Sequence, residues 1–174
     1  LNNTSEFSIC TVSANAGKDT GLCSGQSILL GSDSVAGTAY SWFPDSGLSN
    51  AHTAKPLLSL MNTGQSLLVK SYAVTATNVA GGCSASDTVV ISVFPVPAAN
   101  AGIDKSFTSG DTVHIGSSAL LGNTYSWSPL AGIDDPNAAN PALTLSNTGQ
   151  NIQTVEYVVT LTNAANCSDM DTVK

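Results

Sequence analysis

The chain has 174 residues, of which 42% are hydrophobic and only 10% are charged, and its formal net charge is −7 at pH 7. An acidic chain without a basic cluster is not expected to bind nucleic acid. No apolar run approaches the roughly 18 residues of a membrane span, so none is expected. The sequence begins at Leu1 without a charged-then-apolar leader, which fits a processed protein or an excised piece.

The chain repeats itself with an offset of 127 − 42 = 85 residues. The stretch Tyr-Ser-Trp at 40–42 returns at 125–127, and Asn-Thr-Gly-Gln at 62–65 returns at 147–150. Two units of about 85 residues each suit two small domains. We therefore expect a leading strand or linker at 1–13, a first repeat at 14–98 and a second at 99–174.

The hydrophobic pattern inside each repeat has a period of two, which is typical of strands. In chain order, strands are expected at 5–12, 27–30, 39–43, 69–77, 87–94, 112–115 and 155–162, separated by Gly, Asn, Pro and Ser turns. No window shows an apolar stripe at helical spacing over more than two turns. The sequence therefore predicts an all-β sandwich with antiparallel sheets.

The repeated aromatic residues are expected in the cores. Side chains two residues apart share one face of a strand, so Tyr40 and Trp42 point the same way. A sugar-stacking platform is the alternative, but both copies occupy the same strand position, which favours the core. The predicted core aromatics are Tyr40, Trp42, Tyr72, Tyr125, Trp127 and Tyr157.

Several motifs together resemble a known family. They are Ala-Asn-Ala-Gly-x-Asp at 14–19 and 99–104, Cys-x-Gly at 23–25, Tyr-Ser-Trp-x-Pro at 40–44 and 125–129, and Gly-Cys-Ser-x-x-Asp-Thr-Val at 82–89. This combination resembles the PKD/Ig-like repeats of Bacteroidetes surface proteins, including large adhesins linked to gliding and type IX secretion. The resemblance implies two tandem Ig-like (PKD-type) domains at the cell surface, and it says little about the parent protein. The second repeat departs at Thr108, where Cys is expected, and at Asn166, where Gly is expected.

The four cysteines allow three pairings. In an Ig-type sandwich, Cys23 lies at the opposite end of its domain from Cys83, and Cys10 lies near Cys83. End-to-end stacking of the domains then favours Cys10–Cys83 together with Cys23–Cys167, while an intradomain Cys23–Cys83 bond stays open as the alternative. Either solution indicates an oxidising, extracellular compartment.

The two ends of the chain are out of phase with the repeat. The first repeat ends in the strand 87–94, whereas the second stops at Lys174, so its last strand is expected to be missing. The segment 5–12 would supply one strand in front, and donating it to domain 2 of the next molecule would give a head-to-tail filament.

The residues expected to make that contact are Phe7, Ile9 and Val12. Aligned through Ala14, Phe7 and Ile9 are one residue out of step with the apolar positions of 87–94, so the linker would have to differ by one residue. A fragment cut from a longer array is the alternative.

Catalysis, metal and cofactor binding are not expected. His52 and His114 occupy unmatched repeat positions without a nucleophile motif, and no Cys/His cluster is present. Asp134-Asp135 is read as a turn rather than a Ca²⁺ site. Asp19 and Asp104 are read as turn caps that accept backbone N–H bonds.

Asp-Ser/Thr-Val triplets resemble the O-glycan acceptor pattern of Bacteroidetes exports. Their hydroxyl residues are Ser34, Thr88, Thr112 and Thr172.

The sequence predicts a non-catalytic structural subunit of a secreted surface fibre, assembling through its front strand. A spacer or adhesive segment of a large adhesin is the first alternative, and a carbohydrate-binding module of a secreted enzyme is the second. The expected partners are other copies of the chain, other surface repeats, or glycans.

Overall fold

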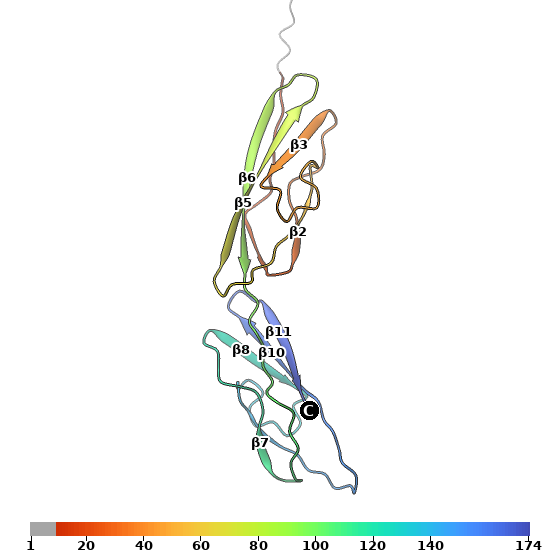
Figure 1. The fold of residues 1–174 in the computed structure, drawn as a ribbon, viewed down its shortest axis with the longest axis vertical. Helices are drawn as coiled ribbons and strands as arrows, with labels where there is room; N and C mark the ends of the chain where they lie inside the picture. Colours follow the sequence, from red (N-terminus) through yellow and green to blue (C-terminus); the bar gives the residue numbers. More distant parts are fainter. Residues whose placement is uncertain (1–9) are drawn as a thin grey trace, which may run out of the picture. The chain divides into compact units, whose positions relative to one another are not determined.

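The computed structural model describes residues 10–174, and all regular structure within them is β. The chain divides into unit 1, which ends at Pro95, and unit 2, which begins at Val96 (Figure 1). This boundary lies three residues before the one expected after residue 98. Residues 10–174 include no long apolar helix of the kind that crosses a membrane.

Unit 1 is a sandwich of two sheets. Its strands are β1 (Thr20–Cys23), β2 (Ser27–Leu29), β3 (Thr38–Phe43), β4 (Leu57–Ser59), β5 (Leu68–Asn78) and β6 (Ser84–Phe94). One sheet has the order β1-β6-β5-β3, and the other pairs β2 with β4. The β1–β6 pair is parallel, whereas the other pairs are antiparallel. The expectation of purely antiparallel sheets is therefore wrong for this pair, because β1 runs in the same direction as β6.

Unit 2 repeats this plan. Its strands are β7 (Thr112–His114), β8 (Asn123–Ser128), β9 (Ala142–Thr144), β10 (Tyr157–Asn163) and β11 (Ser168–Val173). They form a β11-β10-β8 sheet and a β7-β9 sheet. The predicted all-β fold, two tandem Ig-like sandwiches, is confirmed.

Each unit has one tryptophan at the centre of its core. Trp42 is 3% exposed and Trp127 is 1% exposed. Their indole N–H groups donate to the carbonyls of Thr53, at 2.9 Å, and Ala138, at 3.0 Å. A buried indole is tolerated because its one polar atom has a partner.

The four tyrosines divide into two pairs. Tyr72 and Tyr157 are buried, and their hydroxyls donate to the carbonyls of Ser46 and Ala131. Tyr40 and Tyr125 are half-buried at the core margin. Their hydroxyls accept the backbone N–H groups of Val35, at 3.0 Å, and Leu120, at 2.8 Å, so they also hold the loop that precedes their strand.

In each unit, an aspartate on the last strand holds the segment that enters the unit. Asp87 accepts the Ala16 N–H at 2.8 Å, and Asp171 accepts the Ala101 N–H at the same distance. These backbone hydrogen bonds favour the ionised form and lower the pKa of both carboxyls.

Asp19 and Asp104 act on the last strand rather than on a local turn. Asp19 accepts the Val90 N–H at 2.8 Å, and Asp104 accepts the Lys174 N–H at 2.9 Å. The reading of both as turn caps is corrected, because each bond joins residues about 70 positions apart in sequence.

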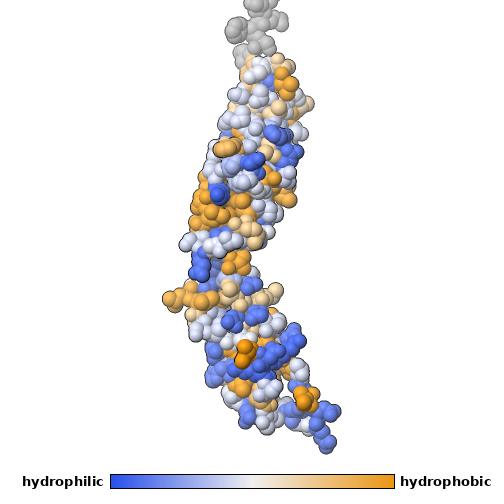
Figure 2. All heavy atoms as spheres, in the orientation of Figure 1, coloured by the Kyte–Doolittle hydropathy of each residue, from blue (hydrophilic) through white to orange (hydrophobic). Residues whose placement is uncertain are grey.

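The surface is largely of intermediate hydropathy, with apolar and strongly polar residues scattered across it (Figure 2). The intermediate hydropathy arises because uncharged polar residues fill many outward positions of the strands, while only 10% of the residues are charged.

Candidate functional site

Residues 10–174 hold no group of three or more His, Cys, Asp or Glu side chains arranged for a metal ion. Asp134 accepts the backbone N–H groups of Asp135, at 2.8 Å, and Ala142, at 2.7 Å, which makes this pair part of a turn. His114 is exposed on β7. Two other features bear on function, namely a disulfide at the β5–β6 loop and one sheet edge of unit 2.

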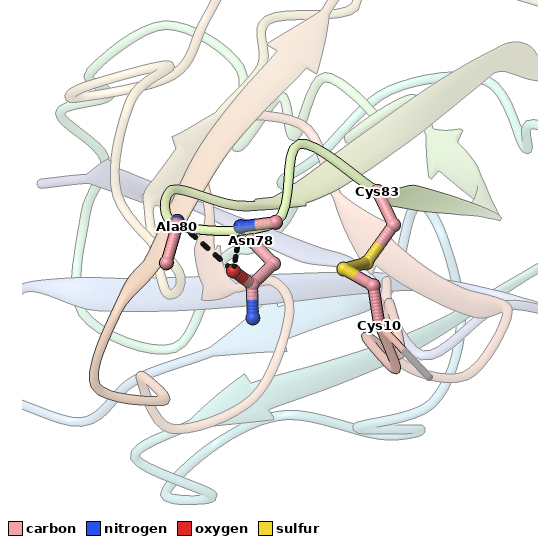
Figure 3. Close-up of a disulfide and its surroundings, with 5 residues drawn as sticks. Cys10, Asn78, Ala80 and Cys83 are labelled. Atoms are coloured by element: carbon pink, nitrogen blue, oxygen red, sulfur yellow. Dashed lines mark hydrogen bonds between the residues drawn. A yellow bond between two sulfur atoms is a disulfide. The ribbon is translucent and has the colours of Figure 1, made fainter. Parts of the chain in front are cut away.

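The disulfide joins Cys10, in the leading segment, to Cys83, directly before β6, with a Cα–Cα distance of 6.0 Å (Figure 3). Asn78 shapes the intervening loop, because its side-chain oxygen accepts the N–H groups of Ala80, at 3.0 Å, and Gly81, at 2.8 Å. A Cβ on Gly81 would collide with the Cys10 sulfur, so this position requires glycine. The bond uses Cys83 and thereby excludes the alternative Cys23–Cys83 pairing.

The equivalent loop of unit 2 is one residue shorter and is built in the same way. Asn163 accepts the N–H groups of Ala165, at 2.9 Å, and Cys167, at 3.0 Å. Asn166 has φ of 60°, close to the 68° of Gly82 in unit 1. Asn therefore replaces the expected Gly because it tolerates the left-handed conformation. Cys167 is 1% exposed, and the Cys23–Cys167 pairing stays a prediction.

The leading segment lies near the β5–β6 loop of unit 1. Val12 is half-buried and lines an open pocket of about 270 Å³ together with Val35 and Asn78. The other two residues expected to make the assembly contact, Phe7 and Ile9, lie outside the described residues.

The last strand of unit 2, β11, differs in length from its counterpart in unit 1, β6. Strand β6 has 11 residues, whereas β11 has six and ends at Val173. The expectation that unit 2 lacks its last strand therefore needs correction: the first half of the strand is present and pairs with β10. The C-terminal marker in Figure 1 lies at the end of β11, while other segments of unit 2 continue past it.

The segments that would flank the second half of this strand are not strands. Residues 105–108 correspond to β1, and residues 153–156 correspond to the first four residues of β5, yet both are irregular. The first contact of the parallel ladder is nevertheless made, because the Lys105 N–H donates to the Lys174 carbonyl at 2.8 Å. We call these two segments the unit 2 edge.

The shorter strand also reduces the core. The buried cluster of unit 1 has three members without a buried counterpart in unit 2, namely Leu22, Ile91 and Val93. Ile91 and Val93 belong to the second half of β6. Phe107 stands in place of Leu22 and is only half-buried. The places of Ile91 and Val93 have no counterpart among the residues of this sequence, because it stops at Lys174.

The four candidate O-glycan acceptors are all exposed. Thr88 and Thr172 lie on β6 and β11 at matching positions, and Thr112 shares a 2.7 Å hydrogen bond with Thr144. Modification of these residues stays a prediction.

No protein-family model and no curated protein matches the chain. Among solved structures, the chain is similar to the Drosophila OTK extracellular domains 3–5, with 14% identity, a TM-score of 0.44, and coverage of 90% of this chain and 57% of that one. It is also similar to the titin Ig tandem domains A164-A165, with 14% identity, a TM-score of 0.34, and 92% of each chain covered. A third similar structure is Drosophila N-cadherin EC1-4, with 18% identity, a TM-score of 0.35, and 91% and 47% covered.

Proposed function

We propose that this chain is a non-catalytic, tandem Ig-like segment of an extracellular surface protein, serving as a spacer or adhesive arm. The observation that carries the proposal is the Cys10–Cys83 disulfide in a duplicated small sandwich. Disulfides of this kind persist in oxidising compartments outside the cytosol. Duplication of one compact unit extends reach without new chemistry.

The outer face of the large sheet of unit 1 is rich in hydroxyl groups. Its residues on β5 and β6 include Ser71, Thr75, Thr77, Ser84, Ser86, Thr88 and Ser92. Thr75 and Ser86 share a 3.0 Å hydrogen bond across the two strands. Such a face stays hydrated through hydroxyl groups rather than charges.

The carbohydrate-binding alternative gains no support from the tryptophans. Trp42 and Trp127 are buried and hydrogen-bonded within their cores, so neither offers a free ring for sugar stacking. Binding to a glycan array that is lost on changing exposed Phe43 to Ser would revive this alternative.

Self-assembly into a head-to-tail filament, in which the leading segment of one molecule completes unit 2 of another, stays a prediction from the sequence.

The extracellular proposal is tested by labelling intact cells of the source organism with an antibody raised against the chain. We expect labelling without permeabilisation. Labelling that appears only after permeabilisation would contradict it. Mass spectrometry of peptides prepared from the same material without reduction tests the predicted second disulfide. We expect a peptide pair that links Cys23 to Cys167.

A further inference from the structure

We propose that the Cys10–Cys83 disulfide makes unit 1 nearly inextensible under tension, because a pull on the chain before Cys10 passes across the bond into β6 and bypasses residues 11–82. The inference deepens the spacer or adhesive-arm role, on which it rests, since an arm that holds a partner or a surface is loaded along its chain. The bond then has a mechanical role in addition to stabilising the fold.

The bond creates a short covalent path through unit 1. It joins Cys10 to Cys83, which are 73 positions apart, with their Cα atoms 6.0 Å from each other. Cys83 directly precedes β6, and β6 ends at Phe94, next to the last residue of the unit, Pro95. From Cys10 to Pro95, the path through the bond therefore covers 95 − 83 = 12 backbone positions, whereas the path along the backbone alone covers 95 − 10 = 85.

The short path has almost no slack, because β6 is already extended. Its 11 residues span about 36 Å at the usual rise of a strand, and 12 positions of fully stretched chain reach about 43 Å. Unit 1 can therefore lengthen by less than about 10 Å while the bond is intact. Without the bond, 85 positions reach about 300 Å, so unfolding would release about 260 Å.

Strand β6 is held on both sides and on one face. It lies between β1 and β5 in the large sheet of unit 1. Its inward residues Val89, Ile91 and Val93 are fully buried. Drawing β6 out of the sheet would break both ladders and expose these side chains, so the strand can carry load while unit 1 stays folded.

The disulfide spares the contacts between β6 and the segment that enters unit 1. In that segment, β1 runs parallel to β6, and Asp87 of β6 accepts the Ala16 N–H at 2.8 Å. Asp19 accepts the Val90 N–H of β6, also at 2.8 Å. In a reduced chain, a pull on the entering segment against the end of β6 would load these hydrogen bonds together. A covalent bond is far stiffer than a hydrogen bond, so the load follows the disulfide while it is intact.

The sandwich itself does not require a disulfide at this place. In unit 2 the counterpart of Cys83 is Cys167, but the counterpart of Cys10 is Pro95. Unit 2 nevertheless forms the corresponding β11-β10-β8 sheet over a buried Trp127. The fold therefore does not account for the bond, whereas a load that enters unit 1 at Cys10 does.

The limit on extension is tested by single-molecule force spectroscopy of the full chain, pulled from its two ends, in a background that carries Cys23→Ser and Cys167→Ser. This background removes the predicted second disulfide, which would restrict extension further. The control also carries Cys10→Ser and Cys83→Ser. We expect the control to show a large unfolding step for each unit, that of unit 1 being about 260 Å, and the oxidised chain to lack the step of unit 1. Two large steps in the oxidised chain overturn the proposal.

The path of the load is tested by reduction at constant force. The oxidised chain of the same background is held under tension, dithiothreitol is added, and the time to the step of about 260 Å is measured. The S–S bond lengthens as a thiolate attacks it, so tension along the bond speeds the exchange. We expect a rate that is proportional to dithiothreitol and rises severalfold with force, whereas unfolding of the control should not depend on the reductant.

A rate of reduction that does not change with force shows that the bond carries no load, and overturns the proposal. That result leaves the spacer role standing, because the labelling of intact cells tests the spacer role separately.

Discussion

Removing the Cys10–Cys83 bond is predicted to destabilise unit 1 selectively. The bond joins residues 73 positions apart. In the loop-closure model, a cross-link of this span lowers the entropy of the unfolded chain enough to contribute about 4 kcal/mol at 25 °C. The Cα–Cα distance of 6.0 Å lies within the usual range, so native geometry should not reduce this value greatly.

The variant carries Cys10→Ser and Cys83→Ser, and each unit's single tryptophan reports its unfolding in urea. Trp127→Phe in both the parent and the variant isolates the Trp42 signal of unit 1, and Trp42→Phe isolates that of unit 2. We expect a loss of about 3–4 kcal/mol in unit 1 and a much smaller change in unit 2. A loss below about 1 kcal/mol in unit 1, or an equal loss in both units, would refute the reasoning.

Three further predictions concern the folded units. Trp42→Ala should cost about 3–5 kcal/mol in unit 1, because it empties the core centre and leaves the Thr53 carbonyl without its donor; a loss under about 1 kcal/mol would place the ring outside the core. Asn166→Val should lower the melting temperature of unit 2 by forcing a β-branched residue into φ of 60°, whereas Asn166→Gly should not, and equal effects would contradict this. Asp87 and Asp171 have lowered pKa values in the folded state because they accept backbone hydrogen bonds. Their contribution is therefore present above the unfolded pKa near 3.9 and is lost as pH falls through the folded pKa. Urea midpoints should fall between pH 5 and pH 2 less in Asp87→Asn than in the parent, with Asp45→Asn as the control for loss of a charge; an unchanged pH dependence would count against the Ala16 contact.

The repeat and the period-two pattern were sufficient to predict the fold. Trp42 and Trp127 lie where the alternation of their strands places them, because an indole at a repeated inward position has no lower-energy place than the core. Strands β4 and β9, of three residues each, were not predicted, whereas β2 and β7, of the same length, were expected within 27–30 and 112–115.

Long-range polar contacts could not be predicted from the sequence. Asp19 and Asp104 lie in turn-like stretches, and nothing local indicates that their carboxylates bind the last strand. Nor does the sequence show that β11 begins as early as Ser168, because the Cys-Ser-Asp run at 167–169 has no apolar alternation. The sequence showed that the second repeat stops early, but it did not show that Ser168–Val173 already forms a strand paired with β10.

Disulfide mapping of the protein from its native source tests the central claim most directly. If the chain works in an oxidising compartment, protein from intact cells that is alkylated before lysis should yield the linked Cys10–Cys83 peptide pair. Recovery of Cys10 and Cys83 as alkylated free thiols would contradict the extracellular account.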